Sequence, residues 1–418
     1  MNRGHHAGPE PGVGEPEGMP PEGIPPPDGM PQGGIRLSLV KGDGAWRLQR
    51  YLHLMPAHGM AAGRRALFFA ALTWLPLMLG AWWARQHGQA APEALLGHYG
   101  VHARCLLAIP LMILAEGIGH RLLPRTLEHF ELAGLVRHAD RESFHAMLNG
   151  VAGLRNRLLP WVLILGLVLA WCTTAVVQGK FSDVDLKLDP RALGQNITFA
   201  HWWFAAVVRP IFFAMLLAWL WRTLLLAILM RRLARFPLCL VPAHPDRRAG
   251  LGLIERLAFI FSPVAFALSA VVAASFAYDV VMRGVNVLDI KFELVGTAIL
   301  VALLFLLPFM PLSWLLFKAK REAMHHYGAL LSHHGRLVYR RWILGERVKD
   351  DPILDAPEIG PSADIQTMYH AVAAMRVLSV DKLGLAAICV PAALPVAAVA
   401  LIQIPFAEVI GRVVKAVM

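Results

Sequence analysis

The sequence has little charge for its length. Only 17% of its 418 residues are charged, whereas 56% are hydrophobic, and the mean hydropathy is positive at +0.51. A water-soluble globular protein of this size normally carries more charge on its surface. The composition therefore predicts a membrane protein whose main partner is the lipid bilayer.

The sequence also has few cysteines, and none of them forms a CxxC pair. The four cysteines all lie inside or at the edge of apolar segments: Cys105, Cys172, Cys239 and Cys389. This placement excludes a disulfide framework and a zinc knuckle, and we expect the thiols to pack as small apolar groups. No nucleotide-binding loop, HExxH, GxSxG or paired-carboxylate motif occurs either, which argues against the familiar enzyme classes and predicts no cofactor.

The histidines do not have the spacing of a metal site. His326 and His333 share a helical face but stand two turns apart, roughly 10 Å along the axis, which is too far to bind one zinc ion. The acidic stretch FSDVDLKLDP lacks the glycine and terminal glutamate of a calcium loop. The sequence predicts no metal site.

The charge that is present is mostly positive and lies between the apolar runs. The formal net charge is +11, but the basic residues form no exposed stripe with interleaved aromatic residues. Such a pattern does not favour nucleic-acid binding. It is typical of membrane topology signals and of contact with anionic lipid headgroups.

Apolar runs approach the ~20 residues that a helix needs to cross a bilayer. Seven occur: Ala66–Ala84, Arg104–Leu123, Leu158–Val177, Trp203–Met230, Leu257–Val280, Glu293–Phe317 and Leu383–Ile404. The last run contains Pro391 and Pro395, so a re-entrant pair of half-helices is an alternative to crossing. The predicted fold is an all-α, polytopic helical bundle with about seven spans.

The basic residues predict the orientation and the domains. They gather in the segments 121–157, 231–256 and 318–382, which we expect to be cytoplasmic and partly helical, and which place the N-terminus in the cytoplasm. Residues 1–34 are rich in Pro and Gly and are expected to be disordered. Residues 35–65 form a basic juxtamembrane segment predicted to lie on anionic headgroups, and 66–418 form the transmembrane domain.

Charged residues inside the spans are the first candidate site. An ionised side chain facing lipid costs at least ~2.5 kcal/mol, so Glu116 and Arg209 should face the bundle interior or water. One hypothesis places Glu116, His120 and Arg209 along a hydrated path. The alternative is a satisfied structural ion pair or, for Arg222, a side chain that reaches the membrane interface.

The loop LCLVPAHPDRRAGLGLI is the second candidate site. In it, His244 and Asp246 could hold a proton or a ligand at the inner face of the membrane. Alternatively, Asp246 accepts backbone N–H bonds and caps the helix that follows, and Gly250 allows a close chain approach.

This loop resembles that of a group of uncharacterised bacterial multi-pass inner-membrane proteins with a Pro-x-His-Pro-Asp turn. The end of the chain is similar too, with Met375-Arg376, Leu394-Pro395 and Ile404-Pro405. The group has Gly where this chain has Ala249. The resemblance implies a multi-pass protein of the bacterial inner membrane and no particular activity.

Three hypotheses for function remain open. The first is a channel- or transporter-like bundle, as a homo-oligomer, with a path past Glu116 and Arg209. The second is a membrane scaffold or sensor that binds a cytoplasmic partner through its Arg-rich loops. The third is a lipid-modifying enzyme that uses His244 and Asp246 at the inner leaflet.

Overall fold

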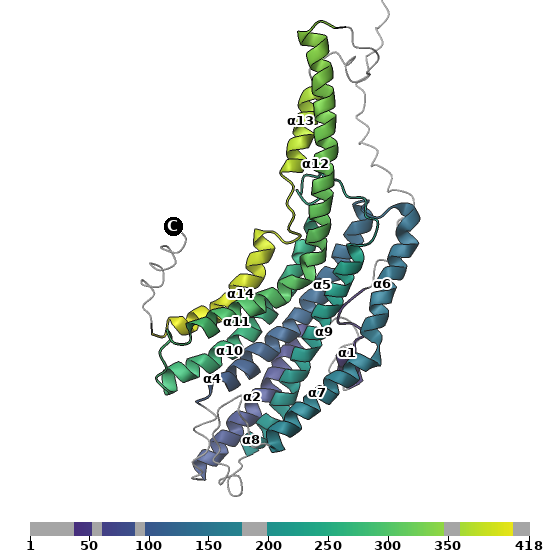
Figure 1. The fold of residues 1–418 in the computed structure, drawn as a ribbon. Coiled ribbons are helices and arrows are strands. Elements are labelled where there is room, and N and C mark those ends of the chain that lie inside the picture. Colours follow the sequence, from purple (N-terminus) through teal and green to yellow (C-terminus); the bar gives the residue numbers. More distant parts are fainter. Residues whose placement is uncertain (1–36, 52–60, 88–96, 178–198, 347–359, 404–418) are drawn as a thin grey trace, which may run out of the picture. The chain divides into compact units, whose positions relative to one another are not determined.

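The computed structural model describes residues 37–51, 61–87, 97–177, 199–346 and 360–403. Every regular element in these ranges is helical (Figure 1). Seven helical segments among them are long and apolar enough to cross a membrane. The predicted all-α, polytopic bundle is confirmed, whereas the predicted tail at residues 1–34 lies outside the described residues.

The helices agree with the apolar runs. Their bounds are α1 Gly44–Tyr51, α2 Ala62–Gln86, α4 Tyr99–His102, α5 Ile109–Leu132, α6 Arg141–Asn156, α7 Leu158–Val177, α8 Phe199–Trp203, α9 Arg209–Leu233, α10 Ser262–Met282, α11 Lys291–Leu306, α12 Met310–Val338, α13 Gly360–Ala373 and α14 Lys382–Ala400. Short π-helical segments (η1 Ala103–Ala108, η3 Phe204–Val208, η6 Tyr339–Ile343) and 3-10 segments (η2 His138–Asp140, η4 Gly252–Ile260, η5 Leu307–Phe309) connect or extend them. The first six predicted spans lie within these helical segments, and the seventh lies on α14 up to Ala400.

Two spans widen into a π-helical turn just before a proline. The segment η1 precedes Pro110, and η3 precedes Pro210. Proline has no N–H, and its ring clashes with the carbonyl four residues earlier, so the preceding turn loosens. At Pro110 and Pro210 the helix therefore has a widened turn and continues through the proline.

An aromatic layer holds four helical segments together in the middle of the bundle. The ring of Phe261 stacks on Phe305 at a centroid distance of 5.0 Å and meets Phe309 and Trp219 edge-on. The indole of Trp219 donates to the carbonyl of Met112 at 3.2 Å. These rings are almost completely buried, so this layer fixes α5, α9, α11 and the start of α10 against one another.

The last helix, α14, packs against α10, α11 and η4. A Cβ atom on Gly384 would lie 3.4 Å from the carbonyl oxygen of Glu255 in η4. Beyond the other end of α14, the Gln403 side chain accepts a hydrogen bond from the N–H of Val287, which follows α10. Because α14 is one continuous helix through Pro391 and Pro395, it matches the crossing alternative rather than two half-helices.

Helix α7 presents most of its surface outward. Its packing partner in the bundle is α9, and the side chains of Leu163, Leu165 and Leu167 are each more than half exposed. So many exposed apolar side chains on one helix would be unfavourable in water. They suit a helix that faces acyl chains.

One end of the bundle carries a folded layer beyond the spans, which we call the basic end. It consists of residues 132–156, 233–256 and 375–381. The N–H of Cys239 donates to the carbonyl of Leu135, Phe144 packs edge-on against Phe236, and the N–H of Arg376 donates to the carbonyl of Arg247. The expected helical content of residues 121–157 is confirmed by the end of α5, η2 and α6.

The course of α14 predicts that its two ends are reached from opposite sides of the membrane. In a background with the four native cysteines replaced by alanine, we expect Lys382→Cys and Gln403→Cys to react with a membrane-impermeant maleimide from opposite sides of membrane vesicles. Both positions are exposed, so burial does not prevent labelling. Labelling of both from the same side would contradict a crossing helix.

Candidate functional site: a buried ion network at the basic end

Glu116 on α5 lies between two arginines. Its Oε2 is 2.6 Å from Nη2 of Arg65 on α2, and its Oε1 is 2.9 Å from Nη1 of Arg222 on α9. All three side chains are at most 5% exposed. The carboxylate therefore joins three different helices at one point.

Arg222 also binds a second carboxylate, that of Asp43. Its Nη2 and Nε lie 2.7 Å and 3.2 Å from the Asp43 Oδ2. Asp43 is fully buried, and Arg222 is 2% exposed. The network of Asp43, Arg65, Glu116 and Arg222 thus contains two cations and two anions. Because each charge has an opposite partner, the large cost of burying these groups is offset.

Asp43 belongs to a short segment, residues 37–43, that enters the bundle at the basic end. Leu37, Ser38, Leu39 and Val40 are each at most 6% exposed, and Leu37 and Leu39 belong to the main apolar core. The prediction that residues 35–65 lie on lipid headgroups is therefore wrong for residues 37–43. Apart from the exposed Lys41, these residues are at least partly buried, because their apolar side chains and the Asp43 carboxylate have partners inside the bundle.

The backbone of this segment is held by side chains from α5 and α6. Arg155 donates to the carbonyl of Ser38, and His120 Nδ1 lies 3.0 Å from the Ser38 hydroxyl. The same hydroxyl accepts the N–H groups of Val40 and Lys41, which forms a tight turn. Asp43 Oδ1 accepts the N–H of Trp46 at 2.7 Å and so caps α1.

Two glycines flank Asp43 because side chains would not fit there. Gly42 has φ +95, and a Cβ atom on it would lie 3.0 Å from the Arg155 guanidinium. A Cβ atom on Gly44 would lie 2.5 Å from the ring of Trp161 at the start of α7. In the sequence Gly-Asp-Gly, the two glycines therefore let the chain pass close to Arg155 and Trp161, and the carboxylate between them binds Arg222.

The residues predicted for a hydrated path are separated by the structure. Glu116 and His120 both belong to the surroundings of residues 37–43. Arg209, in contrast, is 13 residues before Arg222 on the same helix, about 20 Å away along the axis. Its guanidinium lies 6.0 Å from the ring centroid of Trp171. The structure does not bring Glu116 and Arg209 together.

The alternative that Arg222 reaches the membrane interface is wrong, because two buried carboxylates bind it. Sequence reasoning identified Glu116 and missed Asp43 and Arg65. A signal for Asp43 was present, since Gly-Asp-Gly precedes a helix start and Asp is a preferred N-cap residue. Nothing in the local sequence indicated its contact with Arg222.

The loop containing His244 and Asp246 is a capped turn. The Asp246 carboxylate accepts backbone N–H groups from Arg248 at 2.7 Å, Gly250 at 3.2 Å and Gly252 at 2.9 Å. Gly252 is the first residue of η4, as the capping alternative expects. His244 Nδ1 lies 2.9 Å from the same carboxylate.

Hydrogen bonding to the Asp246 carboxylate shifts its acidity. Partial burial favours the protonated form, but the three backbone N–H groups and His244 outweigh it and lower the pKa of Asp246 below its ordinary 3.8. A carboxylate with so many donors is a weak base. This geometry favours a structural role for Asp246 over a role in proton transfer.

The backbone of this loop is left-handed at three positions. Arg247, Ala249 and Gly250 all have positive φ values, 56, 54 and 93, respectively. A Cβ atom on Gly250 would lie 2.8 Å from the side chain of Leu135. Gly250 therefore permits the close approach that was expected of it. Ala249 accepts a left-handed conformation that Gly adopts more readily.

The loop is tied to the chain that leads into α14. Arg248 lies 2.9 Å from Glu255 and 3.1 Å from Asp381, and Arg376 donates to Asp381 as well. A hydrogen bond from the N–H of Lys382 and the two arginines lower the pKa of Asp381. The Pro-x-His-Pro-Asp turn and the Met375-Arg376 pair, far apart in sequence, thus form one unit.

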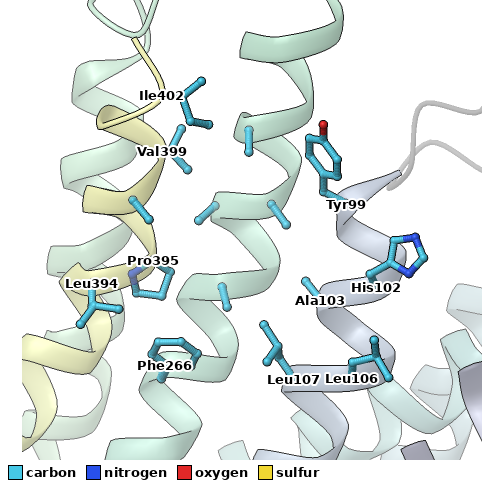
Figure 2. A pocket seen from close by; sticks show the side chains of 15 residues that line it. Tyr99, His102, Ala103, Leu106, Leu107, Phe266, Leu394, Pro395, Val399 and Ile402 are labelled. Atoms are coloured by element: carbon cyan, nitrogen blue, oxygen red, sulfur yellow. The ribbon is translucent and has the colours of Figure 1, made fainter. Parts of the chain in front are cut away.

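The bundle also has an apolar cavity of about 510 Å³ on its side (Figure 2). It lies between α4 with η1, α10 and α14, and its polar lining residues are Tyr99 and His102. A neighbouring cavity of about 560 Å³ shares Leu107 and Phe266 with it. Neither lining includes Asp, Glu, Lys or Arg, so these cavities suit an apolar molecule and not a hydrated ion.

Within the described part of the chain, no group of three or more His, Cys, Asp or Glu side chains is placed to hold a metal ion. Comparison with known proteins gave no relative: no protein-family model, curated protein or solved structure matches the chain. Any assignment of function therefore depends on the geometry described above.

The ion network predicts that replacing one of its charged side chains by an uncharged one strongly lowers the stability of the protein. Arg222→Gln should lower the free energy of unfolding by about 3–5 kcal/mol, because Asp43 would be left buried without its cation. Thermal unfolding in detergent micelles measures this change. Arg64→Gln is the control, since Arg64 is exposed beside Arg65. Equal stability of the two variants would contradict the network.

The capped turn predicts a different pattern at its two polar residues. Asp246→Ala should destabilise the protein by about 2–3 kcal/mol, because charge-assisted hydrogen bonds to backbone N–H groups are lost. His244→Ala should have a much smaller effect, since the His244 side chain is 43% exposed and the three backbone N–H groups still bind the carboxylate without it. Similar losses of stability from the two substitutions would contradict a structural role for the turn.

The lowered pKa of Asp246 also predicts the sign of a pH effect. Its contribution to stability is complete above its unfolded-state value near 3.8 and is lost as the pH falls through the lower folded-state value. Wild type and Asp246→Asn should therefore converge in stability only below about pH 4. Unfolding curves recorded across this range test it, and convergence near neutral pH would be inconsistent with the assignment.

Proposed function

We propose that this chain is a scaffold or sensor of the bacterial inner membrane, with its basic end in the cytoplasm and a partner-binding surface on the hairpin of α12 and α13. The orientation is supported by the concentration of Lys and Arg at the basic end, because such residues are retained on the cytoplasmic side. The resemblance to bacterial multi-pass proteins supports the compartment. The exposed surface of the hairpin supports the binding of a partner.

The hairpin is a rigid extension of a span. Helix α12 and the π-helical turn η6 run without a break from Met310 to Ile343, roughly 50 Å at 1.5 Å per residue. The Lys320 ammonium group donates to the carbonyls of Ala373 and Met375, so α13 packs antiparallel to α12 (Figure 1). The far end of this helix therefore lies more than 20 residues beyond Phe317, where the apolar run ends.

The far end of α12 is the observation that carries the proposal. Tyr339, Trp342, Ile343 and Leu344 are 51–71% exposed there, next to the exposed Arg336 and Arg340. An exposed group of large apolar side chains with arginines is unusual on a protein surface that has no partner. Trp, Tyr and Arg are also the residues most enriched at binding hot spots. The chemistry fits a partner segment with apolar and acidic side chains.

The ion network agrees with a scaffold better than with an ion path. The span charges Arg65, Glu116 and Arg222 pair with one another, and Arg222 also binds the chain's own Asp43, which makes the network neutral. Groups used in this way are not available to line a hydrated route. The enzyme hypothesis is weakened in a similar way, since the Asp246 carboxylate is occupied by backbone donors.

One specific observation still favours the transporter hypothesis. The two adjoining apolar cavities beside α10 would accept an apolar or amphipathic molecule from the membrane. If the protein transports anything, its substrate class is lipid-like, and transport would proceed along the side of the bundle. This second function does not use Arg209 or Glu116.

The scaffold proposal predicts a specific contact at the end of α12. A photo-reactive amino acid at Trp342 should give a discrete cross-linked protein adduct in intact cells, and Arg336→Glu with Arg340→Glu should abolish it. The same amino acid at Ile299 is the control, because this exposed residue of α11 belongs to a membrane span. Absence of an adduct at Trp342, or ion flux in proteoliposomes that Glu116→Gln abolishes, would contradict the proposal.

A further inference from the structure

The surroundings of residues 37–43 form a seat with an excess of positive charge. We call seat the set Arg65, Glu116, His120, Arg155, Trp161 and Arg222. His120, Arg155 and Arg222 contact residues 37–43 directly, Trp161 lies against Gly44, and Glu116 and Arg65 are joined to Arg222 by ion pairs. Without Asp43, the seat would hold three buried arginines and one glutamate. Such an excess of buried positive charge is costly, so the empty seat would have a strong preference for a carboxylate.

The seat also selects the shape of what it binds. At Gly42 the φ of +95 disfavours any side chain, and at Gly44 a Cβ atom would lie 2.5 Å from the ring of Trp161. Leu37 and Leu39 fill apolar space in the core, five residues or fewer ahead of the glycine pair. The seat therefore fits a peptide with apolar residues followed by a carboxylate between two glycines.

The segment that fills the seat is not part of a span. It is followed by α1, on which Arg47, Arg50 and Tyr51 are exposed. None of residues 37–43 belongs to a helix, so their withdrawal need not unfold a span.

We propose that the seat is a peptide-docking site that residues 37–43 occupy as an intramolecular ligand, and that a partner segment with an acidic, glycine-flanked turn takes their place when they withdraw. The site is distinct from the hairpin surface and lies at the end of the spans. Withdrawal of residues 37–43 makes the seat accessible, and the partner's carboxylate then binds Arg222.

The test uses the full-length protein in nanodiscs and a fluorescent peptide of residues 35–46, with binding followed by anisotropy. Wild type should bind this peptide weakly, because its seat is filled and only the open fraction is competent. Asp43→Asn should bind it at least about tenfold more tightly. A peptide with Asn in place of the Asp should bind neither protein, and this peptide also corrects for partition into the nanodisc.

Three results would overturn the proposal: equal binding by wild type and Asp43→Asn, equal binding of the Asp and Asn peptides, or undiminished binding after Arg222→Gln is added to Asp43→Asn. If Asp43→Asn does not fold, Leu39→Ala weakens the segment while the carboxylate remains, and it should likewise bind the peptide more tightly than wild type does. Failure of Leu39→Ala to do so counts against the proposal. Trp342→Ala should leave peptide binding unchanged, which separates this test from that of the hairpin.

Discussion

Arg222 lies buried between two carboxylates that come from different parts of the chain, Glu116 on α5 and Asp43 ahead of the first span. A guanidinium in such a place cannot lose its charge, so its surroundings must supply the compensation. Arg65 restores neutrality by binding the other oxygen of Glu116. The positions of α2, α5, α9 and residues 37–43 therefore depend on one another, and the remaining structure at the basic end is arranged around them.

The neighbouring layers follow from this arrangement. On one side of the network, Trp219 lies one turn before Arg222 and joins the aromatic layer of Phe261, Phe305 and Phe309. On the other side, the loop capped by Asp246 packs on Leu135 and is tied to the start of α14 by Arg248. Apolar packing holds the spans, and polar contacts with defined geometry hold the layer beyond them.

The sequence was sufficient to predict the helices and the capped turn. In a bilayer, a long apolar run satisfies its backbone hydrogen bonds by forming a helix, so the spans could be predicted from hydropathy. The contact between Asp246 and the N–H groups that follow it is local, and local geometry is readable from residue types. The contact between Asp43 and Arg222 joins residues 179 positions apart, and no periodicity encodes such a pairing. For the same reason the sequence indicated that Glu116 was significant but suggested Arg209 as its companion. Arg209 lies on the same helix as Arg222, which binds Glu116, but about 20 Å away along the axis.

A double-mutant cycle between Asp43 and Arg222 tests the central claim most directly. The free energy of unfolding would be measured in detergent for wild type, Asp43→Asn, Arg222→Gln and the double variant. The account predicts a coupling energy of at least about 1 kcal/mol, because the two side chains contact each other in a buried network. Additive losses, with a coupling energy near zero, would contradict it.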